Sequence, residues 1–335
     1  VKMGKKKYSK KRTLKGKKIS VLLTTLLVGV AFLLGTWVER DYLSFSLIEN
    51  YIKEVQLYIE SIEIPSNDKS KDIKGNLSEI HFFDVGQGGS TLLQAYDGTN
   101  ILIDTGRYDS DETEIINYLN DEIGVGGSID LLIFTHNDAD HIGNGDAVLE
   151  YFQVDEVWMN GVDHTSQTYS QVLDSIIDAD VVYKEPLAGE AFDLGAFSIE
   201  VLNPIEDMEN KSQNDASIAT RISIGDSSII QTGDVSGQIE ERILKDYIGS
   251  LQSDIMVLGH HGSRTSTSKE WLQDVNPKVT VYQAGMGNVY EHPHKEVLNK
   301  VVDQSIEVYG TDKNGSIQIN IKQDNQLEVF LEEEK

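Results

Sequence analysis

The sequence contains no cysteine and only 5 prolines in 335 residues. Without cysteine, the chain cannot form disulfides, bind zinc through thiolates or use a thiol as a nucleophile. Any metal ion must therefore be bound by histidine and carboxylate side chains. With 39% hydrophobic residues and so few prolines, the chain can bury a sizeable core, as one large domain or two modest ones.

Basic residues are scarce outside the N-terminus. Residues 1–18 hold ten of the 29 Lys and Arg residues and no acid, so the rest of the chain carries 19 basic and 55 acidic side chains, or −36. So acidic a region repels polyanions at long range. Contact with a nucleic acid would therefore need a local basic patch or bound cations.

Charge of either sign is absent from residues 19–38, ISVLLTTLLVGVAFLLGTWV. As a helix with a rise of about 1.5 Å per residue, this stretch matches a hydrocarbon core of about 30 Å, so we expect a transmembrane anchor. The basic tail 1–18 should then be cytoplasmic, with residues 39–335 outside the cell membrane. A cleaved signal peptide is the alternative, but its apolar run usually has about 7–15 residues and no A-x-A-like site follows here.

Residues 39–76 are predicted to form a juxtamembrane helix and a linker. Apolar residues such as Leu47, Ile48, Tyr51, Ile52, Val55 and Ile59 recur at helical spacing. The polar stretch PSNDKSKDIKGN that follows is rich in turn-forming residues. The helix is compatible with a stalk, with packing on the next domain and with dimerisation.

From residue 77 onward, short apolar runs predict strands: EIHFFDV, STLLQAY, NILIDTG and IDLLIFT. Helical patterns alternate with later runs: ETEIINYLNDEI, SQVLDSIID, QIEERILKDYI and HKEVLNKVVD. We therefore predict an α/β domain over residues 77–335. Chemically versatile polar residues follow the apolar runs, which predicts a site built from loops at one edge of a sheet.

The stretch THNDADHIG places two histidines and two aspartates directly after the apolar run IDLLIF. A turn after a strand can direct His136, Asp138, Asp140 and His141 towards a metal ion. The alternative is an ordinary turn in which Asn137 or Asp140 caps the next helix. Four potential ligands within six residues favour the metal site.

Two further strands end in potential ligands. SSIIQTGDVS delivers Asp234, and SDIMVLGHHGSRTS delivers His260 and His261. A carboxylate can bridge two cations, and neutral imidazoles complete the coordination without adding charge. His292 and His294 form another pair in NVYEHPHKEV, which favours a role in the site over a simple turn before a helix.

The segment from FDVGQGGS through HNDADHIG, TGD and HHGSRTS resembles the metallo-β-lactamase superfamily. Within it, the sequence is most similar to the extracytoplasmic hydrolase domain of ComEC-type DNA-uptake competence proteins. The resemblance covers about residues 77–322 and includes NDASIATRISIGDSSIIQTGD and GMGNVYEHPH. It implies a four-layer αβ/βα sandwich with a binuclear metal site at one edge of its paired sheets.

The resemblance also implies two divalent metal ions, zinc or manganese, and their ligands. These are His136 and Asp138 for one ion, Asp140 and His141 for the other, Asp234 as the bridge and His261 completing the second ion's coordination. Asp84 matches an early aspartate of the family that supports the site through hydrogen bonds. Gly86 and Gly88 let the backbone turn tightly beside it.

Two positions depart from the pattern of many superfamily members. Asp138 stands where a histidine is common, which makes the first metal position richer in oxygen and manganese as plausible as zinc. The histidine of the third motif is missing, and Asn214 and Asp215 stand in its region as expected supports of the site. One metal position would then be weaker, exchangeable or completed by water. The ComEC-type branch shares both departures.

The resemblance implies hydrolysis of a phosphodiester. Two cations lower the pKa of a shared water, hold the resulting hydroxide and neutralise charge on the substrate. By analogy, Asp140 orients the nucleophile. His260, His292 or His294 would protonate the leaving oxygen or bind a phosphate.

Four residues of the later loops are predicted substrate contacts: Ser263, Arg264, Asn288 and Tyr290. Ser263 and Arg264 can supply donors that offset the acidic surroundings. Their loop is equally compatible with a solvated serine-rich turn.

These features favour a membrane-anchored, outward-facing phosphodiesterase, a nuclease acting on DNA outside the membrane. One membrane helix cannot form a transport channel, so the protein would degrade DNA or assist a separate channel of a DNA-uptake machinery. The enzymatic alternative is a phosphoesterase for cell-envelope material such as the phosphocholine of teichoic acids, although choline-binding repeats are absent from the sequence. The non-enzymatic alternative is an anchored binding module that holds metal only for folding.

Overall fold

The computed structural model describes residues 75–107, 113–206 and 212–332. These residues fall within one compact unit, Asn67–Lys335. The predicted cytoplasmic tail, the anchor at 19–38 and nearly all of the juxtamembrane segment lie outside the described residues. Among the helices in the described ranges, none is long and apolar enough to cross a membrane.

One sheet contains eight strands: β1 (Asn76–Phe82), β2 (Thr91–Ala95), β3 (Asn100–Ile103), β5 (Leu131–Ile133), β7 (Glu156–Trp158), β8 (Val182–Lys184), β16 (Ile317–Lys322) and β17 (Leu327–Leu331). Their order is β17-β16-β1-β2-β3-β5-β7-β8. β3, β5, β7 and β8 are parallel, and the other pairs are antiparallel.

The other large sheet contains seven strands: β9 (Ala191–Leu194), β10 (Phe197–Asn203), β11 (Ala219–Ile224), β12 (Ser227–Gln231), β13 (Ile255–Val257), β14 (Val279–Tyr282) and β15 (Glu307–Gly310). Their order is β15-β14-β13-β12-β11-β10-β9, and β12 to β15 are parallel. A small parallel pair joins β4 (Ser128–Ile129) to β6 (Gln153–Val154).

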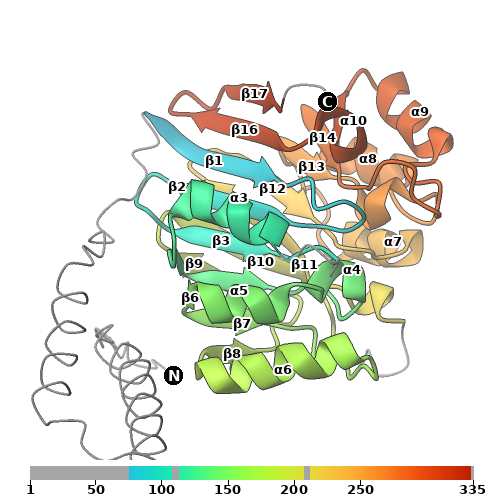
Figure 1. The fold of residues 1–335 in the computed structure, drawn as a ribbon. Helices are drawn as coiled ribbons and strands as arrows, with labels where there is room; N and C mark the ends of the chain where they lie inside the picture. Colours follow the sequence, from blue (N-terminus) through green and yellow to red (C-terminus); the bar gives the residue numbers. More distant parts are fainter. Residues whose placement is uncertain (1–74, 108–112, 207–211, 333–335) are drawn as a thin grey trace, which may run out of the picture. The chain divides into compact units, whose positions relative to one another are not determined.

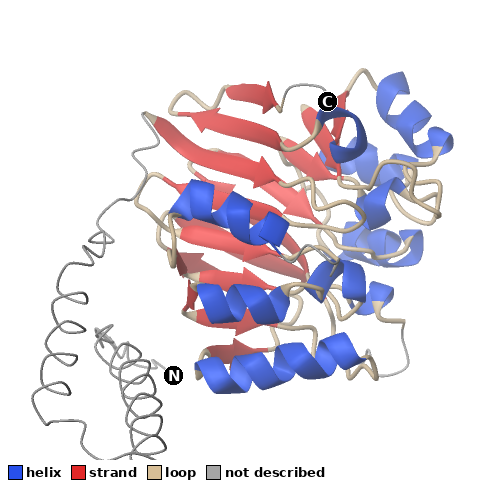
Figure 2. Ribbon diagram, viewed as in Figure 1, coloured by secondary structure: helices blue, strands red, loops and turns tan. Residues whose placement is uncertain are grey.

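The described helices cover the outer faces of the two large sheets (Figures 1 and 2). Those packed on the eight-stranded sheet are α3 (Thr113–Ile123), α5 (Gly145–Tyr151) and α6 (Gln167–Ala179). Those packed on the seven-stranded sheet are α7 (Gly237–Asp246), α8 (Lys269–Val275) and α9 (Lys295–Asp303). Short helical turns complete the set: α4 (Ala139–Ile142), η1 (Asn214–Ala216), η2 (Gly259–Gly262) and α10 (Thr311–Asn314).

Three hydrophobic cores hold these layers together. The central core joins the two sheets, with Phe82 and Ile133 of one sheet and Ile229 and Val281 of the other fully or almost fully buried. The second core lies between the seven-stranded sheet and its helices, and the third lies between the eight-stranded sheet and its helices. This helix–sheet–sheet–helix arrangement confirms the predicted four-layer sandwich.

Helix boundaries follow from local sequence. Ser166 caps α6 by accepting the N–H of Tyr169, and Ser268 caps α8 by accepting the N–H of Trp271. Each of these helices ends at a residue in the left-handed conformation, Asp180 or Asn276. Polar residues with short side chains favour both kinds of helix end.

Candidate metal centre

Residues in the loops that follow four strands meet at one edge of the sandwich. Asp104 follows β3, His136 comes soon after β5, Asp234 follows β12 and His261 follows β13. The carboxyl ends of parallel strands are the usual place for a site in such sheets. Within the described residues, two groups have potential ligand atoms all within 4.8 Å of one another: His136, His141 and Asp234, and Asp140, His141 and His261.

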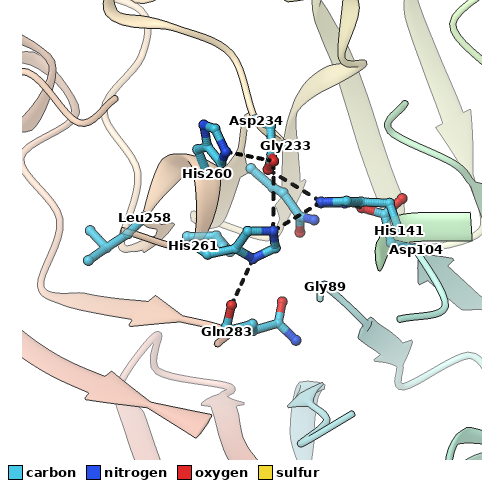
Figure 3. Close-up of a pocket in the computed structure, with 11 residues that line it drawn as sticks. Gly89, Asp104, His141, Gly233, Asp234, Leu258, His260, His261 and Gln283 are labelled. Atoms are coloured by element: carbon cyan, nitrogen blue, oxygen red, sulfur yellow. Dashed lines mark hydrogen bonds and ion pairs between the residues drawn. The ribbon is translucent and has the colours of Figure 1, made fainter. Parts of the chain in front are cut away.

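The Asp234 carboxylate lies at the centre of this cluster (Figure 3). Four imidazole Nε2 atoms surround its oxygens, at 3.4 Å for His141, 3.5 Å for His260, 3.7 Å for His261 and 3.9 Å for His136. These contacts join ligands that lie far apart in sequence. A carboxylate in this position could bridge two cations.

His141 is oriented by the buried carboxylate of Asp104. The two groups are 2.8 Å apart, from Nδ1 to Oδ2, and Asp104 also accepts the N–H and the hydroxyl of Thr135. Because Nδ1 donates its N–H to this carboxylate, Nε2 is the ring nitrogen that faces Asp234. This arrangement is the usual way in which a protein orients a metal-binding histidine.

His261 is oriented in the same sense by a backbone carbonyl. Its Nδ1 donates to the carbonyl oxygen of Gln283 at 2.8 Å, so its Nε2 faces Asp140 at 3.5 Å and the Nε2 of His141 at 3.2 Å. Two imidazole lone pairs this close repel each other unless a proton or a metal ion lies between them. His260 and His261 also have positive φ angles of 51° and 55°, a strained conformation that tends to occur at functional sites.

His136 presents a buried nitrogen that needs a ligand. Its side chain is fully buried, and its Nε2 atom has no hydrogen-bond partner in the described residues. The nearest oxygen of Asp138 is 3.6 Å away. Asp138 precedes α4 without capping it through its side chain, and neither Asn137 nor Asp140 occupies the N-cap position. An unpaired buried nitrogen costs free energy, which a metal ion bound there would remove.

The electrostatics of the cluster also fit a cation. Burial disfavours the charged form of Asp234, but His141 and His261 hold its pKa well below the usual range. Burial likewise opposes protonation of His141, but Asp234 and Asp104 raise its pKa well above that of free histidine. The buried carboxylates are therefore stabilised in their charged form by nearby positive charge, which a bound divalent cation would supply.

A cavity of about 20 Å³ lies at the centre, lined by residues that include Gly89, Asp104, His141, Asp234 and His261 (Figure 3). This volume suffices for about one water-sized occupant. Its nitrogen and carboxylate donors, without any thiolate, fit divalent ions such as zinc or manganese.

Asp104 supports the candidate ligand His141, a role that the sequence prediction missed, and the supporting role predicted for Asp84 stays a prediction. Asp84 stabilises its own turn, since its carboxylate accepts the N–H of Gly86 at 3.2 Å and its N–H donates to Ser316. Asp104 forms a hydrogen bond with the candidate ligand His141. The sequence does contain a signal for Asp104, because this residue directly follows the apolar run NILI. In the same way, the TGD motif with Asp234 follows the run SSIIQ.

Asn214 and Asp215 support the backbone around Asp234. The carbonyl oxygen of Asn214 accepts the hydroxyl of Ser217 at 2.7 Å, and this hydroxyl oxygen accepts the N–H of Asp234 at 3.2 Å. The carboxylate of Asp215 accepts the N–H of Ser236 at 3.2 Å. The two residues thus hold the loop that carries the central carboxylate.

His164 is a second residue near the site that sequence did not indicate. Its Nε2 lies 3.7 Å from Asp138, and its Nδ1 accepts the N–H of Ser166 at 3.2 Å. In this tautomer, assigned from the hydrogen bonds, Nε2 carries a proton that points towards Asp138. His164 stands alone in the sequence, away from the strand ends, so no local pattern marked it.

The structure brings the predicted histidine pair 292 and 294 to the same edge. The ring centroid of His292 lies 5.4 Å from that of His260, 6.2 Å from that of His261 and 5.0 Å from that of His294. Burial and the neighbouring histidines lower the pKa of His292 to about 4. His294 accepts the backbone N–H of Arg264 through Nδ1.

The four predicted substrate contacts differ in their surroundings. Ser263 is buried and Arg264 is exposed. Asn288 fixes the position of His292, because its side chain both donates to the carbonyl oxygen and accepts the N–H of that residue. Tyr290 is 51% exposed, and its ring stacks on that of His292.

Comparison with known families agrees with this geometry. The sequence profile of the metallo-β-lactamase superfamily matches residues 83–285, a range that contains every potential ligand of the centre. The chain belongs to the metallo-β-lactamase superfamily. The predicted family and the predicted metal-dependent hydrolase class are confirmed.

Curated relatives identify the branch. The chain is 31% identical over 260 residues to ComE operon protein 3 of Bacillus subtilis (strain 168), covering 73% of this chain and 33% of that protein. It is 29% identical over 251 residues to competence protein ComA of Neisseria gonorrhoeae, with the same coverage of both chains. It is 28% identical over 255 residues to recombination protein 2 of Haemophilus influenzae, covering 75% of this chain and 30% of that protein.

These matches confirm the predicted resemblance to competence proteins. The chain spans only about a third of the length of these relatives. What they do as whole proteins therefore extends to this chain only as a proposal.

Proposed function

We propose that the protein is a membrane-anchored, metal-dependent phosphodiesterase that acts as a nuclease on DNA outside the membrane. The observation that carries this proposal is the carboxylate of Asp234 among four imidazoles, with the Asp140–His261 pair beside it. Such a donor set suits two divalent cations. When bound, they lower the pKa of a water and neutralise charge on a phosphodiester.

The chain's own side chains supply orientation and proton transfer. Burial opposes ionisation of Asp140, but hydrogen bonding and charge from His261 and His141 keep its pKa below the ordinary range. It therefore remains a carboxylate that can accept a hydrogen bond from an attacking water. The lowered pKa of His292 keeps its ring neutral near pH 7. The N–H of this neutral ring would donate a hydrogen bond to the leaving oxygen.

The choice of DNA rests on the relatives, two of which are named for competence and recombination. The membrane anchor rests on the uncharged residues 19–38. Zinc and manganese are both compatible with the histidine and carboxylate donors. The protein would act alone in degrading DNA or together with a DNA-uptake machinery.

The test is hydrolysis by the full chain, purified in detergent and supplied with zinc or manganese. Substrates are bis-p-nitrophenyl phosphate, single-stranded DNA, duplex DNA, RNA and a phosphocholine ester. We expect hydrolysis of bis-p-nitrophenyl phosphate and DNA, with DNA cleavage weakening as salt rises. Failure on every phosphodiester would refute the proposal, and exclusive hydrolysis of the phosphocholine ester would favour the cell-envelope alternative.

The variant Asp140→Ala separates an enzyme from a module that uses metal only for folding. In an enzyme, kcat/KM should fall by about 10²-fold or more while the protein stays folded. Loss of fold together with activity would indicate a structural metal. Asp178→Ala is the matched control, because Asp178 is exposed on α6.

A further inference from the structure

An open groove of about 410 Å³ lies beside the metal centre. It is lined by residues from the segment 287–298 and by two residues of α10, among them Asn288, Glu291, His292, Lys295, Asp312 and Lys313. The volume is within the range of roughly 300–1,000 Å³ that is typical of ligand sites. The groove adjoins the metal centre because His292, one of its lining residues, packs against the rings of His260 and His261.

A row of stacked rings runs from the metal centre through His292, which lines the groove, to Tyr290 beside it. The rings of His261 and His292 have centroids 6.2 Å apart and an interplanar angle of 27°. The rings of His292 and Tyr290 are 5.7 Å apart at 25°. Tyr290 is half-exposed at the outer end of the row, so the next ring in the same series would come from a ligand.

Three of the six Lys and Arg residues in the described ranges that form no salt bridge lie at or near the same groove, and one of them, Lys313, lies over the ring of Tyr282. Of the twelve Lys and Arg side chains in the described residues, six form a salt bridge with a carboxylate. Arg264, Lys295 and Lys313 are not among these six. Lys295 and Lys313 line the groove, and the backbone of Arg264 donates to His294, which adjoins His292.

The groove is therefore unusual in a chain that is otherwise strongly acidic. Its two lysines offset the charges of Glu291 and Asp312, which also line it. Of the nine other Lys and Arg side chains in the described residues, six form a salt bridge with a carboxylate. A polyanion approaching the metal centre would meet less repulsion along this groove than over an acidic surface.

We propose that the groove binds single-stranded DNA next to the phosphodiester to be cleaved. The base of a neighbouring nucleotide stacks on Tyr290, and the flanking phosphates contact Arg264, Lys295 and Lys313. This inference rests on the proposed nuclease function and adds the form of the substrate. A duplex keeps its bases stacked on one another, so it cannot offer a free base to Tyr290.

The first test measures binding by fluorescence anisotropy to the full chain, loaded with zinc and carrying Asp140→Asn to suppress cleavage. The probes are a labelled 12-nucleotide oligothymidylate and an abasic strand of the same length and charge. Tyr290→Ala should weaken binding of the thymidylate roughly 5- to 100-fold, as loss of one stacked base predicts, and weaken binding of the abasic strand much less. Tyr290→Phe should retain the difference between the probes, and Tyr183→Ala, an exposed tyrosine of β8, is the control.

The second test concerns the phosphates. The double variant Lys295→Gln/Lys313→Gln should weaken the binding of both probes. It should also reduce the slope of log K against log salt concentration by roughly 1.4, the value for two lost phosphate contacts with a single strand. Lys245→Gln/Lys278→Gln changes the charge equally, but at lysines that are paired with Glu241 and Asp254. It should leave the salt dependence as in the parent chain.

Three results would overturn the inference: equal losses for the thymidylate and abasic strands in Tyr290→Ala, an unchanged salt dependence in the double lysine variant, or a 12-base-pair duplex bound as tightly as the single strand. The proposed function fails separately, since it is judged by hydrolysis of bis-p-nitrophenyl phosphate, which has no base and no neighbouring phosphate. A chain that hydrolyses this ester without binding the thymidylate would thus lose the groove as a DNA site and remain a phosphodiesterase.

Discussion

Among single residues that are not themselves candidate metal ligands, Asp104 should have the largest effect on metal affinity. Its carboxylate fixes the tautomer of His141 and also binds Thr135, which lies beside His136. Asp104→Asn preserves the size of the side chain but can present an amide N–H to Nδ1. We expect metal affinity to fall by about 10- to 100-fold, measured by competition with a chromogenic chelator.

Asp130→Asn is the matched control for this substitution. Asp130 also accepts a backbone N–H, that of Asn100, but it precedes β5 and so lies at the opposite end of the strand from His136. Its variant should retain the metal affinity of the parent chain. Equal losses in both variants would mean that Asp104 acts only through the stability of the sheet.

Alanine variants of two glycines in the loop after β1, Gly86 and Gly88, should differ in activity. A Cβ at Gly88 would clash with the carbonyl oxygen of Asp140, whereas a Cβ at Gly86 would meet nothing within 4 Å. Both have positive φ, so each alanine costs roughly 1–2 kcal/mol of backbone strain. Gly88→Ala should in addition displace Asp140 and lower kcat/KM at least tenfold below that of Gly86→Ala. Similar activities in the two variants would contradict this account.

The candidate metal ligands could be predicted where several of them stand close together in the sequence just after an apolar strand. His136, Asp138, Asp140 and His141 stand within six residues, and the structure brings them to one edge. His164 could not be found in this way, because its position near Asp138 depends on how the loop after β7 folds over the site. Contacts of this kind arise from tertiary packing and leave no local pattern.

At the scale of elements, helix α7 anchors the strained loop that carries His260 and His261. Its Glu240 carboxylate accepts the N–H groups of Thr267 and Ser268, and the hydroxyl of Thr267 accepts the N–H of Gly259. A buried carboxylate thus holds both ends of the loop in place. The two left-handed histidines depend on this support.

Glu240 and its neighbour Glu241 should affect stability with opposite pH dependence. Burial raises the pKa of Glu240 above the unfolded value of 4.5, so its favourable contribution is present below pH 4.5 and is lost as the pH rises through the folded pKa. A hydrogen bond with Lys245 lowers the pKa of Glu241, so its contribution is present above pH 4.5 and is lost as the pH falls. Urea unfolding between pH 3 and 7 measures both effects.

The variants Glu240→Gln and Glu241→Gln each remove one of these titrations. The parent chain should lose stability relative to Glu240→Gln as the pH rises above 4.5. Relative to Glu241→Gln it should lose stability as the pH falls below 4.5, by a smaller amount because Glu241 is exposed and screened by solvent. The same trend in both variants would exclude burial as the cause at Glu240.

Long periodic helices were predictable from the sequence, and the short helical elements were not. The patterns that predict helices at ETEIINYLNDEI and HKEVLNKVVD correspond to α3 and α9. Helix α8 has only seven residues, too few for its apolar spacing to stand out, and η2 contains two histidines that no propensity scale would place in a left-handed turn. Both elements are stabilised by packing and by hydrogen bonds to distant residues.

For the whole molecule, the division of ligands between the two halves matters most. Asp140 and His141 come from the half with the eight-stranded sheet, and Asp234 and His261 come from the half with the seven-stranded sheet. A metal ion would therefore connect the two halves at one edge. The central core already joins the sheets without any metal ligand, so the fold does not depend on that connection alone.

Removal of metal should consequently lower stability without unfolding the protein. At a free metal concentration of about 100 times Kd, binding contributes about 2.7 kcal/mol, which corresponds to roughly 5–10 °C in Tm for a domain of this size. Chelation should lower Tm by this amount, leave the far-ultraviolet circular dichroism unchanged and abolish hydrolysis, and added zinc or manganese should restore both properties. In His141→Asn, the chelator should change Tm much less. Complete unfolding of the parent chain on chelation would instead support a metal that serves only the fold.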